Sequence, residues 1–152
     1  MLLGLIADTH GLLREEAVRA LSGVDRIVHA GDIGEPALLE RLGAIAPVTA
    51  VRGNNDRGSW ARALPGTEVV EAGGLLLYVL HDLHELTIAP EAAGFHAVIC
   101  GHSHRPSVEV RQGVLFVNPG SAGPRRFTLP VSLAFLDIEG GRASARIHLL
   151  QP

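Results

Sequence analysis

Short apolar runs separated by polar loops occupy the first two thirds of this chain. The runs cover residues 2–7, 26–30, 48–52, 75–80 and 97–100. They are continuous rather than alternating, which is typical of strands covered on both faces. Two helical segments separate the first three runs, one at 12–21 and one that begins near Pro36 and ends about Leu42. This order predicts parallel strands joined by right-handed crossovers.

From residue 67 onward the pattern changes to strands joined by tight turns. We predict strands at 67–71, 74–80, 107–110, 114–118, 132–138 and 143–149, and a further helix only at 88–93. Turns that contain glycine at 72–73, 111–113 and 139–141 are suited to hairpins. A parallel half followed by an antiparallel half predicts an α/β fold of two packed sheets with helices outside. No linker or repeat interrupts the pattern, so we expect a single domain over residues 1–152.

Each of the five apolar runs ends on side chains that can bind a metal ion. In an open α/β sheet, ligands bind beyond the carboxyl ends of the strands, where the following loops meet. Two pairs of candidate ligands are spaced i, i+2: Asp8 with His10, and His102 with His104. In extended backbone, side chains two positions apart point the same way, so we expect each pair to hold one ion from one side. The seven candidate ligands are Asp8, His10, Asp32, Asn54, His81, His102 and His104.

The chemistry of these seven side chains indicates more than one ion. Two carboxylates, one amide oxygen and four imidazoles exceed the four ligands of a tetrahedral zinc site. They suit two divalent ions that share a bridging carboxylate and a bridging hydroxide. Mixed nitrogen and oxygen ligands without thiolate favour a transition metal over Ca²⁺, with Mn²⁺ first and Fe, Zn²⁺ or Ni²⁺ as alternatives.

Composition narrows the range of partners. The net charge is −3 and aromatic residues make up 4% of the 152 residues, so neither a basic surface nor a stacking surface for nucleic acid is expected. No apolar run is long enough to span a membrane, and the first run lacks the features of a signal peptide, so a cytoplasmic location is expected. The single cysteine, Cys100, excludes an internal disulfide and is expected to be buried.

All thirteen basic residues are arginine. Arg57, Arg105 and Arg125 each lie within a few residues of a motif loop, and a guanidinium binds phosphate oxygens through a planar fork. They are therefore candidates to bind a substrate phosphate, with solvated surface charge as the alternative for each one. Two interpretations of His29 are also open. It is either a histidine packed within a strand or a side chain that supports Asp32.

The ordered motifs Asp8-x-His10, Gly31-Asp32, Gly53-Asn54-x-Asp56, His81 and Gly101-His102-x-His104 resemble the calcineurin-like metallophosphoesterase superfamily, and within it the small phosphodiesterases of the YfcE type. The resemblance implies a four-layer αββα sandwich, in which two mixed β-sheets are flanked by helices. It further implies that Asp32 bridges two ions. Besides Asp32, one ion would be bound by Asp8, His10 and His104. The other ion would be bound by Asn54, His81 and His102, again together with Asp32.

The same resemblance implies a metal-dependent phosphodiesterase that hydrolyses small phosphodiesters through in-line attack of the bridging hydroxide, with Asn55 and Asp56 as further catalytic residues. Many members of the superfamily carry histidine where this chain has Asn55. An amide cannot act as a general acid, so poor leaving groups should react slowly. Relatives also place glycine directly after the ligand histidine, whereas here Asp82 follows His81, which leaves the role of His84 open.

Two other functions compete with this interpretation. One is a non-catalytic scaffold on the same fold, like the retromer subunit; the other is a nuclease. Competent ligands at all seven positions favour the enzyme over the scaffold, and the acidic net charge disfavours the nuclease. Exposed apolar strands in the second half are compatible with a homo-oligomer.

Overall fold

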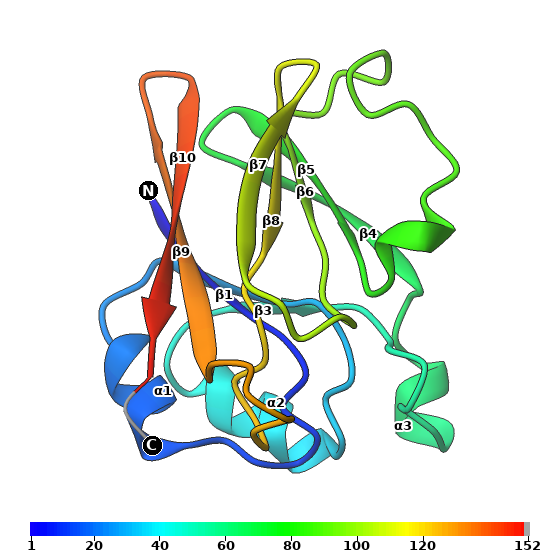
Figure 1. The fold of residues 1–152 in the computed structure, drawn as a ribbon, viewed down its shortest axis with the longest axis vertical. Helices are drawn as coiled ribbons and strands as arrows, with labels where there is room; N and C mark the ends of the chain where they lie inside the picture. The colour runs from blue at the N-terminus through cyan, green and yellow to red at the C-terminus, as the bar shows by residue number, and fades with distance from the viewer. Residues whose placement is uncertain (151–152) are drawn as a thin grey trace.

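The computed structural model describes residues 1–150 and consists mainly of strands (Figure 1). Its elements in chain order are β1 (Leu2–Ile6), α1 (Glu15–Ala20), β2 (Arg26–His29), α2 (Pro36–Gly43), β3 (Val48–Ala50), α3 (Ser59–Arg62), β4 (Thr67–Ala72), β5 (Leu75–Leu80), the 3₁₀ helix η1 (Leu83–Glu85), β6 (Ala97–Ile99), β7 (Ser107–Arg111), β8 (Val114–Asn118), β9 (Ser132–Glu139) and β10 (Arg142–Leu149). All the predicted strands are present.

The strands form two mixed sheets of five strands each. The first has the order β10-β9-β1-β2-β3, and the second has the order β4-β5-β6-β8-β7. Strands β1, β2 and β3 are parallel, as are β5, β6 and β8, while β9, β10, β4 and β7 are antiparallel to their neighbours. The expected antiparallel second half is wrong, because β5, β6 and β8 pair in parallel within it. The hairpin β9–β10 also leaves that half and pairs with β1, 129–135 residues away along the chain.

The alternation of side chains along the strands divides the core into layers. Leu3 and Leu5 point between the two sheets, where they meet Leu77 and Val117 of the second sheet. Ile6 lies on the opposite face of β1 and packs in the cluster that contains α1 and α2 residues. Burial on both faces explains why the parallel runs are continuous in hydrophobicity.

The outer layers differ in thickness. Helices α1 and α2 cover the first sheet, with Ala17 and Leu38 among the packed residues. The outer face of the second sheet is covered by the segment that begins at η1, through Leu83 and Leu86. The helix predicted at 88–93 is absent: these residues form turns. Pro90 and Gly94, the latter with φ of +84°, explain why the helical spacing does not yield a helix there. In residues 1–150, no helix has the length and hydropathy that crossing a membrane requires.

Candidate metal centre

All seven candidate ligands follow the carboxyl ends of parallel strands. Asp8, Asp32 and Asn54 come after β1, β2 and β3 of the first sheet. His81 follows β5 of the second sheet, and His102 and His104 follow β6. Because the parallel strands of the two sheets end at the same edge of the sandwich, loops almost a hundred residues apart meet there.

Hydrogen bonds from the candidate ligands tie the two sheets together. The backbone N–H of His102 donates to Asp8 Oδ2 at 3.0 Å. His81 Nδ1 lies 2.8 Å from the carbonyl oxygen of Ala30, and because a carbonyl only accepts, this nitrogen carries the proton. The bond fixes the imidazole so that Nε2 faces the other ligands, as is usual for metal-binding histidines.

The backbone at these positions is strained. Among the described residues, seven non-glycine residues have positive φ, and five of the seven are candidate ligands: Asp8, His10, Asp32, His102 and His104, with φ between 46° and 72°. This conformation is costly for residues with a Cβ and clusters at functional sites. It also corrects the sequence argument for the two i, i+2 pairs, because their backbone is left-handed rather than extended.

The ligand atoms converge at distances suited to shared coordination. Asp8 Oδ1 lies 3.5 Å from His104 Nε2 and 3.9 Å from both His10 Nε2 and His81 Nε2. Asp32 Oδ2 lies 3.4 Å from His81 Nε2 and 3.7 Å from His10 Nε2. Ligand atoms bound to one ion at about 2.1 Å are themselves roughly 3–3.5 Å apart, so modest side-chain adjustment brings these atoms into one coordination sphere.

The unpartnered atoms fit a metal. Four buried side-chain nitrogen and oxygen atoms of the described residues have no hydrogen-bond partner, and all four belong to candidate ligands: Asp8 Oδ1, His10 Nε2, His81 Nε2 and His104 Nδ1. Buried polar groups without a partner are costly, so a group that binds them is expected. Two ligand sets, Asp8–His10–His104 and Asp8–Asp32–His81, each have their ligand atoms within 4.8 Å of one another. The two sets share Asp8, whereas the resemblance implies that Asp32 bridges.

Electrostatics keep Asp32 ionised. Burial opposes the charge, but contacts with His81 and hydrogen bonds from Asn55 outweigh it and hold the pKa of Asp32 well below its ordinary value. Burial likewise opposes protonation of His81, yet its contact with Asp32 raises its pKa above the ordinary value. A buried carboxylate held in its charged form is ready to bind a cation.

The remaining two candidate ligands lie at the rim. His102 Nδ1 is 3.1 Å from Asn54 Oδ1, and the ring of His102 meets the ring of His81 edge to face, with centroids 5.2 Å apart. Asp82 connects this rim to η1, because its Oδ2 lies 3.7 Å from His102 Nε2 and its Oδ1 lies 3.1 Å from His84 Nδ1. His84 is exposed and contacts the carboxylate of Asp82.

The two predicted catalytic residues have different surroundings. Asn55 donates to both oxygens of Asp32, from its backbone nitrogen and from Nδ2, each at 2.9 Å. Asp56 is buried, and its oxygens accept from the backbone N–H groups of Ile33, Gly34 and Gly53 at 2.9–3.0 Å. These contacts show that Asp56 holds the loops after β2 and β3 together. Its catalytic role stays a prediction.

His29 supports the loops that carry Asp8 and Asp32. Its Nδ1 accepts from Gly31 N–H at 3.1 Å, so Nε2 carries the proton and donates to Thr9 Oγ1 at 2.9 Å. The Thr9 hydroxyl in turn donates to the carbonyl oxygen of Ile33 at 2.9 Å. Burial lowers the pKa of His29 to about 3, which keeps this chain of hydrogen bonds intact near neutral pH. His29 is thus both a packed strand histidine and a support for the site.

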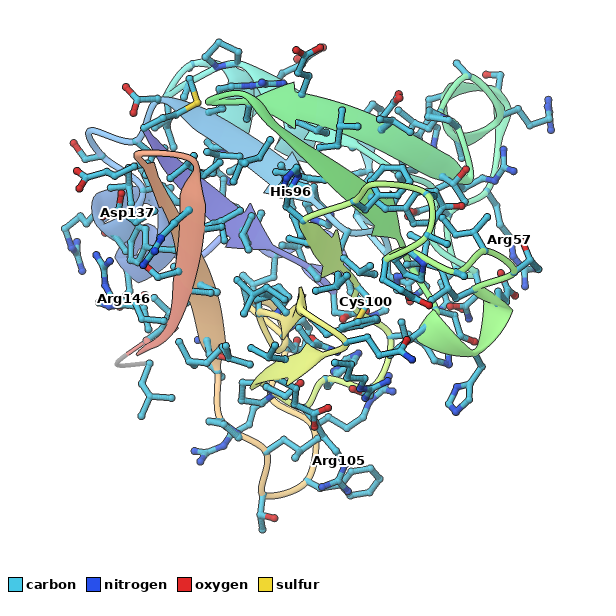
Figure 2. The ribbon with its side chains drawn as sticks, turned by 90° about the horizontal axis from the view of Figure 1, so that it is seen from above. Arg57, His96, Cys100, Arg105, Asp137 and Arg146 are labelled. Atoms are coloured by element: carbon cyan, nitrogen blue, oxygen red, sulfur yellow. The ribbon has the colours of Figure 1, made fainter. Side chains whose placement is uncertain are left out.

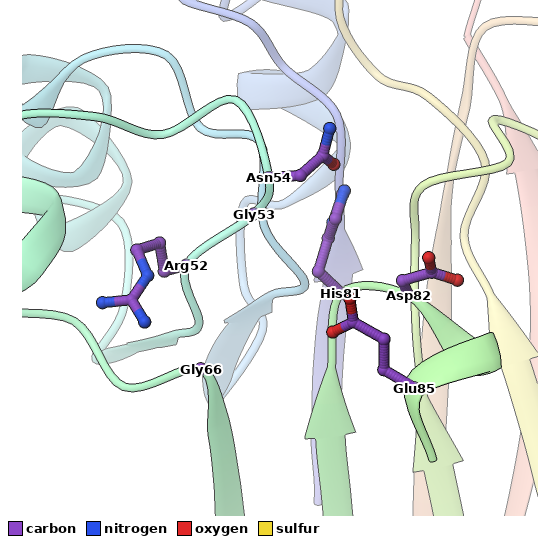
Figure 3. A pocket seen from close by; sticks show the side chains of 7 residues that line it. All are labelled: Arg52, Gly53, Asn54, Gly66, His81, Asp82 and Glu85. Carbon is purple, nitrogen blue, oxygen red and sulfur yellow. The ribbon is translucent and has the colours of Figure 1, made fainter.

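A pocket of about 180 Å³ opens beside the candidate ligands and contains an arginine that sequence reasoning missed (Figure 3). Arg52 lines it together with Gly53, Asn54, Gly66, His81, Asp82 and Glu85. The sequence assigned Arg52 to a strand, but β3 ends two residues earlier, at Ala50. A second pocket of about 150 Å³ is lined in part by Leu83, His84 and His102, and Asp82 lines both pockets.

The three arginines predicted to bind phosphate lie elsewhere. Arg57 and Arg105 are exposed on separate parts of the surface (Figure 2), and neither lines the two pockets beside the ligands. Arg125 Nε donates to the carbonyl oxygen of Leu129 within its own loop, at 3.3 Å. Phosphate binding by these residues stays a prediction. Cys100 is buried as expected, and burial raises the pKa of its thiol to about 12.

Residues 1–141 match the family model of the calcineurin-like phosphoesterase superfamily domain. The chain belongs to this superfamily. It is 31% identical to a probable metallophosphoesterase of Methanothermobacter thermautotrophicus, over 97% of this chain and 91% of that protein. It is 26% identical to a phosphodiesterase of Methanocaldococcus jannaschii, over 91% of this chain and 94% of that protein.

Solved structures of the superfamily share the fold. The phosphoesterase YfcE from E. coli is 28% identical and superimposes with a TM-score of 0.70, over 90% of this chain and 88% of that chain. Vps29 of Chaetomium thermophilum is 21% identical, with a TM-score of 0.80 over 99% of this chain and 97% of that chain. At this identity the second likeness shows the fold alone. The resemblance drawn from the motifs is therefore confirmed for the family and for the two-sheet sandwich.

Proposed function

We propose that this phosphoesterase is a phosphodiesterase that uses two divalent ions, Mn²⁺ first among them, to hydrolyse small phosphodiesters. The observation that carries the proposal is the set of four buried, unpartnered atoms, all on candidate ligands at one edge of the sandwich. Two ions there would supply a water of lowered pKa as the in-line nucleophile and would neutralise charge on the phosphate. A cytoplasmic location belongs to the same proposal.

The protein's own residues prepare the site for this chemistry. Asn55 holds Asp32 through both oxygens, and Ala30 fixes the tautomer of His81, so the ligands are oriented before anything binds. No histidine stands at position 55 to protonate a leaving group. Diesters with good leaving groups are therefore the expected substrates, because they depart without a proton.

Two further observations favour a diester over a monoester. A phosphodiester carries two ester arms, and two pockets that meet at Asp82 flank the candidate ligands. A relative aligned over nearly the whole chain is named a phosphodiesterase. We propose that each arm has its own place beside the metals.

The test is hydrolysis of bis(4-nitrophenyl) phosphate with Mn²⁺, with bound metal counted by elemental analysis. We expect turnover that a chelator abolishes, and a loss of at least about 10²-fold in Asp32→Asn and His104→Ala. Asp137→Asn is the matched control, since Asp137 lies on β9 at a distance from the site (Figure 2). Full activity in Asp32→Asn with unchanged metal content would contradict the mechanism.

The two competing functions have distinct outcomes in the same experiments. Bound metal without hydrolysis of any phosphoester would support the scaffold. Cleavage of single- or double-stranded DNA, with binding that weakens steeply as salt rises, would support the nuclease.

A further inference from the structure

One pocket beside the candidate metal ligands is lined by two opposite charges that form no ion pair within residues 1–150. Among the ion pairs of residues 1–150, neither Arg52 nor Glu85 takes part in one, although both line the same 180 Å³ pocket. Figure 3 shows Arg52 on one side of this pocket and Glu85 on the other, with His81 between them. The two side chains do not pair with each other, so both are available to a guest that spans the pocket.

The exposed Arg52 side chain makes one hydrogen bond that orients its guanidinium. Its NH1 donates to the carbonyl oxygen of Leu64 at 3.2 Å, and its backbone nitrogen donates to the carbonyl oxygen of Pro65 at 2.8 Å. Only one of its five N–H donors is used in this way. The other N–H groups of the guanidinium are available to acceptor atoms in the pocket.

The opposite wall of the pocket bears carboxylates. Glu85 belongs to η1, whose N-cap is Asp82, and both residues line the pocket. The backbone and side chain of His84 occupy Asp82 Oδ1, whereas no hydrogen bond or ion pair within residues 1–150 engages the Glu85 carboxylate. Glu85 is therefore the acceptor available for N–H donors of a guest. Two carboxylates on this wall also repel a guest that carries a second phosphate.

These observations define the chemistry of the guest. It must present acceptor atoms to a planar guanidinium and, on a neighbouring edge, N–H donors to a carboxylate. Guanine does so with O6 and N7 on one edge, which bind arginine in a bidentate manner, and with N1–H and the 2-amino group on the next. Methyl and aryl groups offer neither kind of atom. Because Asn54 and His81 line the same pocket, a guest there lies next to two of the candidate metal ligands.

We propose that the Arg52–Glu85 pocket binds a guanine base on the arm of the phosphodiester that stays on the phosphate. The inference rests on the proposed phosphodiesterase function, and it adds the substrate class. Arg52 and Glu85 act as specificity residues that touch the base. They take no part in breaking the P–O bond.

The experiment compares two diesters with the same leaving group, guanosine 5′-(4-nitrophenyl phosphate) and methyl 4-nitrophenyl phosphate. We expect kcat/KM to favour the guanosine ester, and expect Glu85→Gln and Arg52→Gln to reduce that preference by about 10-fold each, since each removes a charged hydrogen bond. The readout is the ratio of kcat/KM for the two esters, because a loss that both esters share cancels in it. Arg62→Gln and Glu40→Gln, which lie outside the pocket, are the matched controls.

The outcomes separate this inference from the proposed function. If Arg52→Gln lowers activity on both esters equally, Arg52 binds the scissile phosphate and the inference is overturned. An unchanged preference in both variants overturns it as well. If the wild type hydrolyses neither ester, the proposed function fails. The inference is then tested by titrating the protein with guanosine and following the NMR signal of the Arg52 side chain. A chemical-shift change that is smaller in Glu85→Gln supports the inference, and no change in the wild type overturns it.

Discussion

At the scale of single residues, this site depends on atoms whose roles follow from hydrogen-bond direction. The side-chain amide of Asn55 donates to Asp32 Oδ2 at 2.9 Å. His29 can support Thr9 and Gly31 only as a neutral imidazole with the proton on Nε2. Each of these residues leads to a prediction that a single substitution tests.

Asn55→His should speed up the hydrolysis of diesters with poor leaving groups. An imidazole can donate the proton that an amide cannot, which is commonly worth about 10²–10⁴ in rate. We expect methyl phenyl phosphate to gain more than methyl 4-nitrophenyl phosphate, whose leaving group needs no proton. Asn55→Ala is the control, because it also loses the hydrogen bond to Asp32. An equal effect of both variants on both esters would show that position 55 only supports Asp32.

Acid should destabilise the fold through His29. Its pKa is about 3 in the folded protein and near 6.5 when unfolded, so the stability that it contributes is complete above pH 6.5. That stability is lost as pH falls from 6.5 towards 3, by about 1.4 kcal/mol per pH unit. Urea unfolding with chelator at pH 7, 6 and 5 measures the loss. His29→Leu should start from a lower stability and fall less steeply; parallel pH profiles would contradict the assignment.

At the scale of elements, the close approach of the loops that follow the strands brings the candidate ligands together. Gly53 lies so close to Asp32 that a Cβ on it would overlap Asp32 Oδ1 and the Asp32 backbone nitrogen. A Cβ on Gly31, whose φ is +101°, would come within 2.6 Å of His81 Nδ1. The two glycines let the loops after β2, β3 and β5 approach one another, which brings their ligands to one place.

Gly53→Ala should therefore lower metal affinity far more than an average glycine substitution. The added methyl group has to displace the carboxylate of Asp32, so we expect at least about 10-fold weaker metal binding, in the range seen for disturbed ligand support. Gly43→Ala is the control, because a Cβ there meets nothing within 4 Å and alanine favours the helix α2. Metal titration by calorimetry distinguishes the two. Equal affinities would mean that the loop yields without moving Asp32.

At the scale of the whole molecule, the candidate metal ligands connect the two sheets. Asp8 of the first sheet accepts from the backbone of His102, and His81 of the second sheet donates to Ala30. Four buried atoms of the described ligand side chains have no internal partner: Asp8 Oδ1, His10 Nε2, His81 Nε2 and His104 Nδ1. An ion bound there links both sheets and removes the cost of these unpartnered atoms.

Metal should consequently stabilise the fold as well as the site. With free Mn²⁺ at about 100 times its dissociation constant, unfolding should cost about 2.7 kcal/mol more, which raises Tm by roughly 5–10 °C for a chain of this size. Thermal unfolding with Mn²⁺ and with chelator measures the difference. His104→Ala should reduce the gain, whereas Asp137→Asn should keep it. A Tm that does not respond to metal would contradict this link between the two sheets.

The sequence by itself determined the strands, the two-sheet α/β class and the seven candidate ligands, because hydrophobic runs and the polar residues that follow them are local features. Only the tertiary structure decided that β9 and β10 return to β1, that the 88–93 segment is not a helix, and that Arg52 lines the pocket beside the candidate ligands. It also replaced the extended backbone expected at Asp8 and His10 with a left-handed one. The physical reason is that these features depend on contacts between distant segments: a strained φ, a tautomer or a shared pocket is imposed by neighbours that the local pattern does not contain.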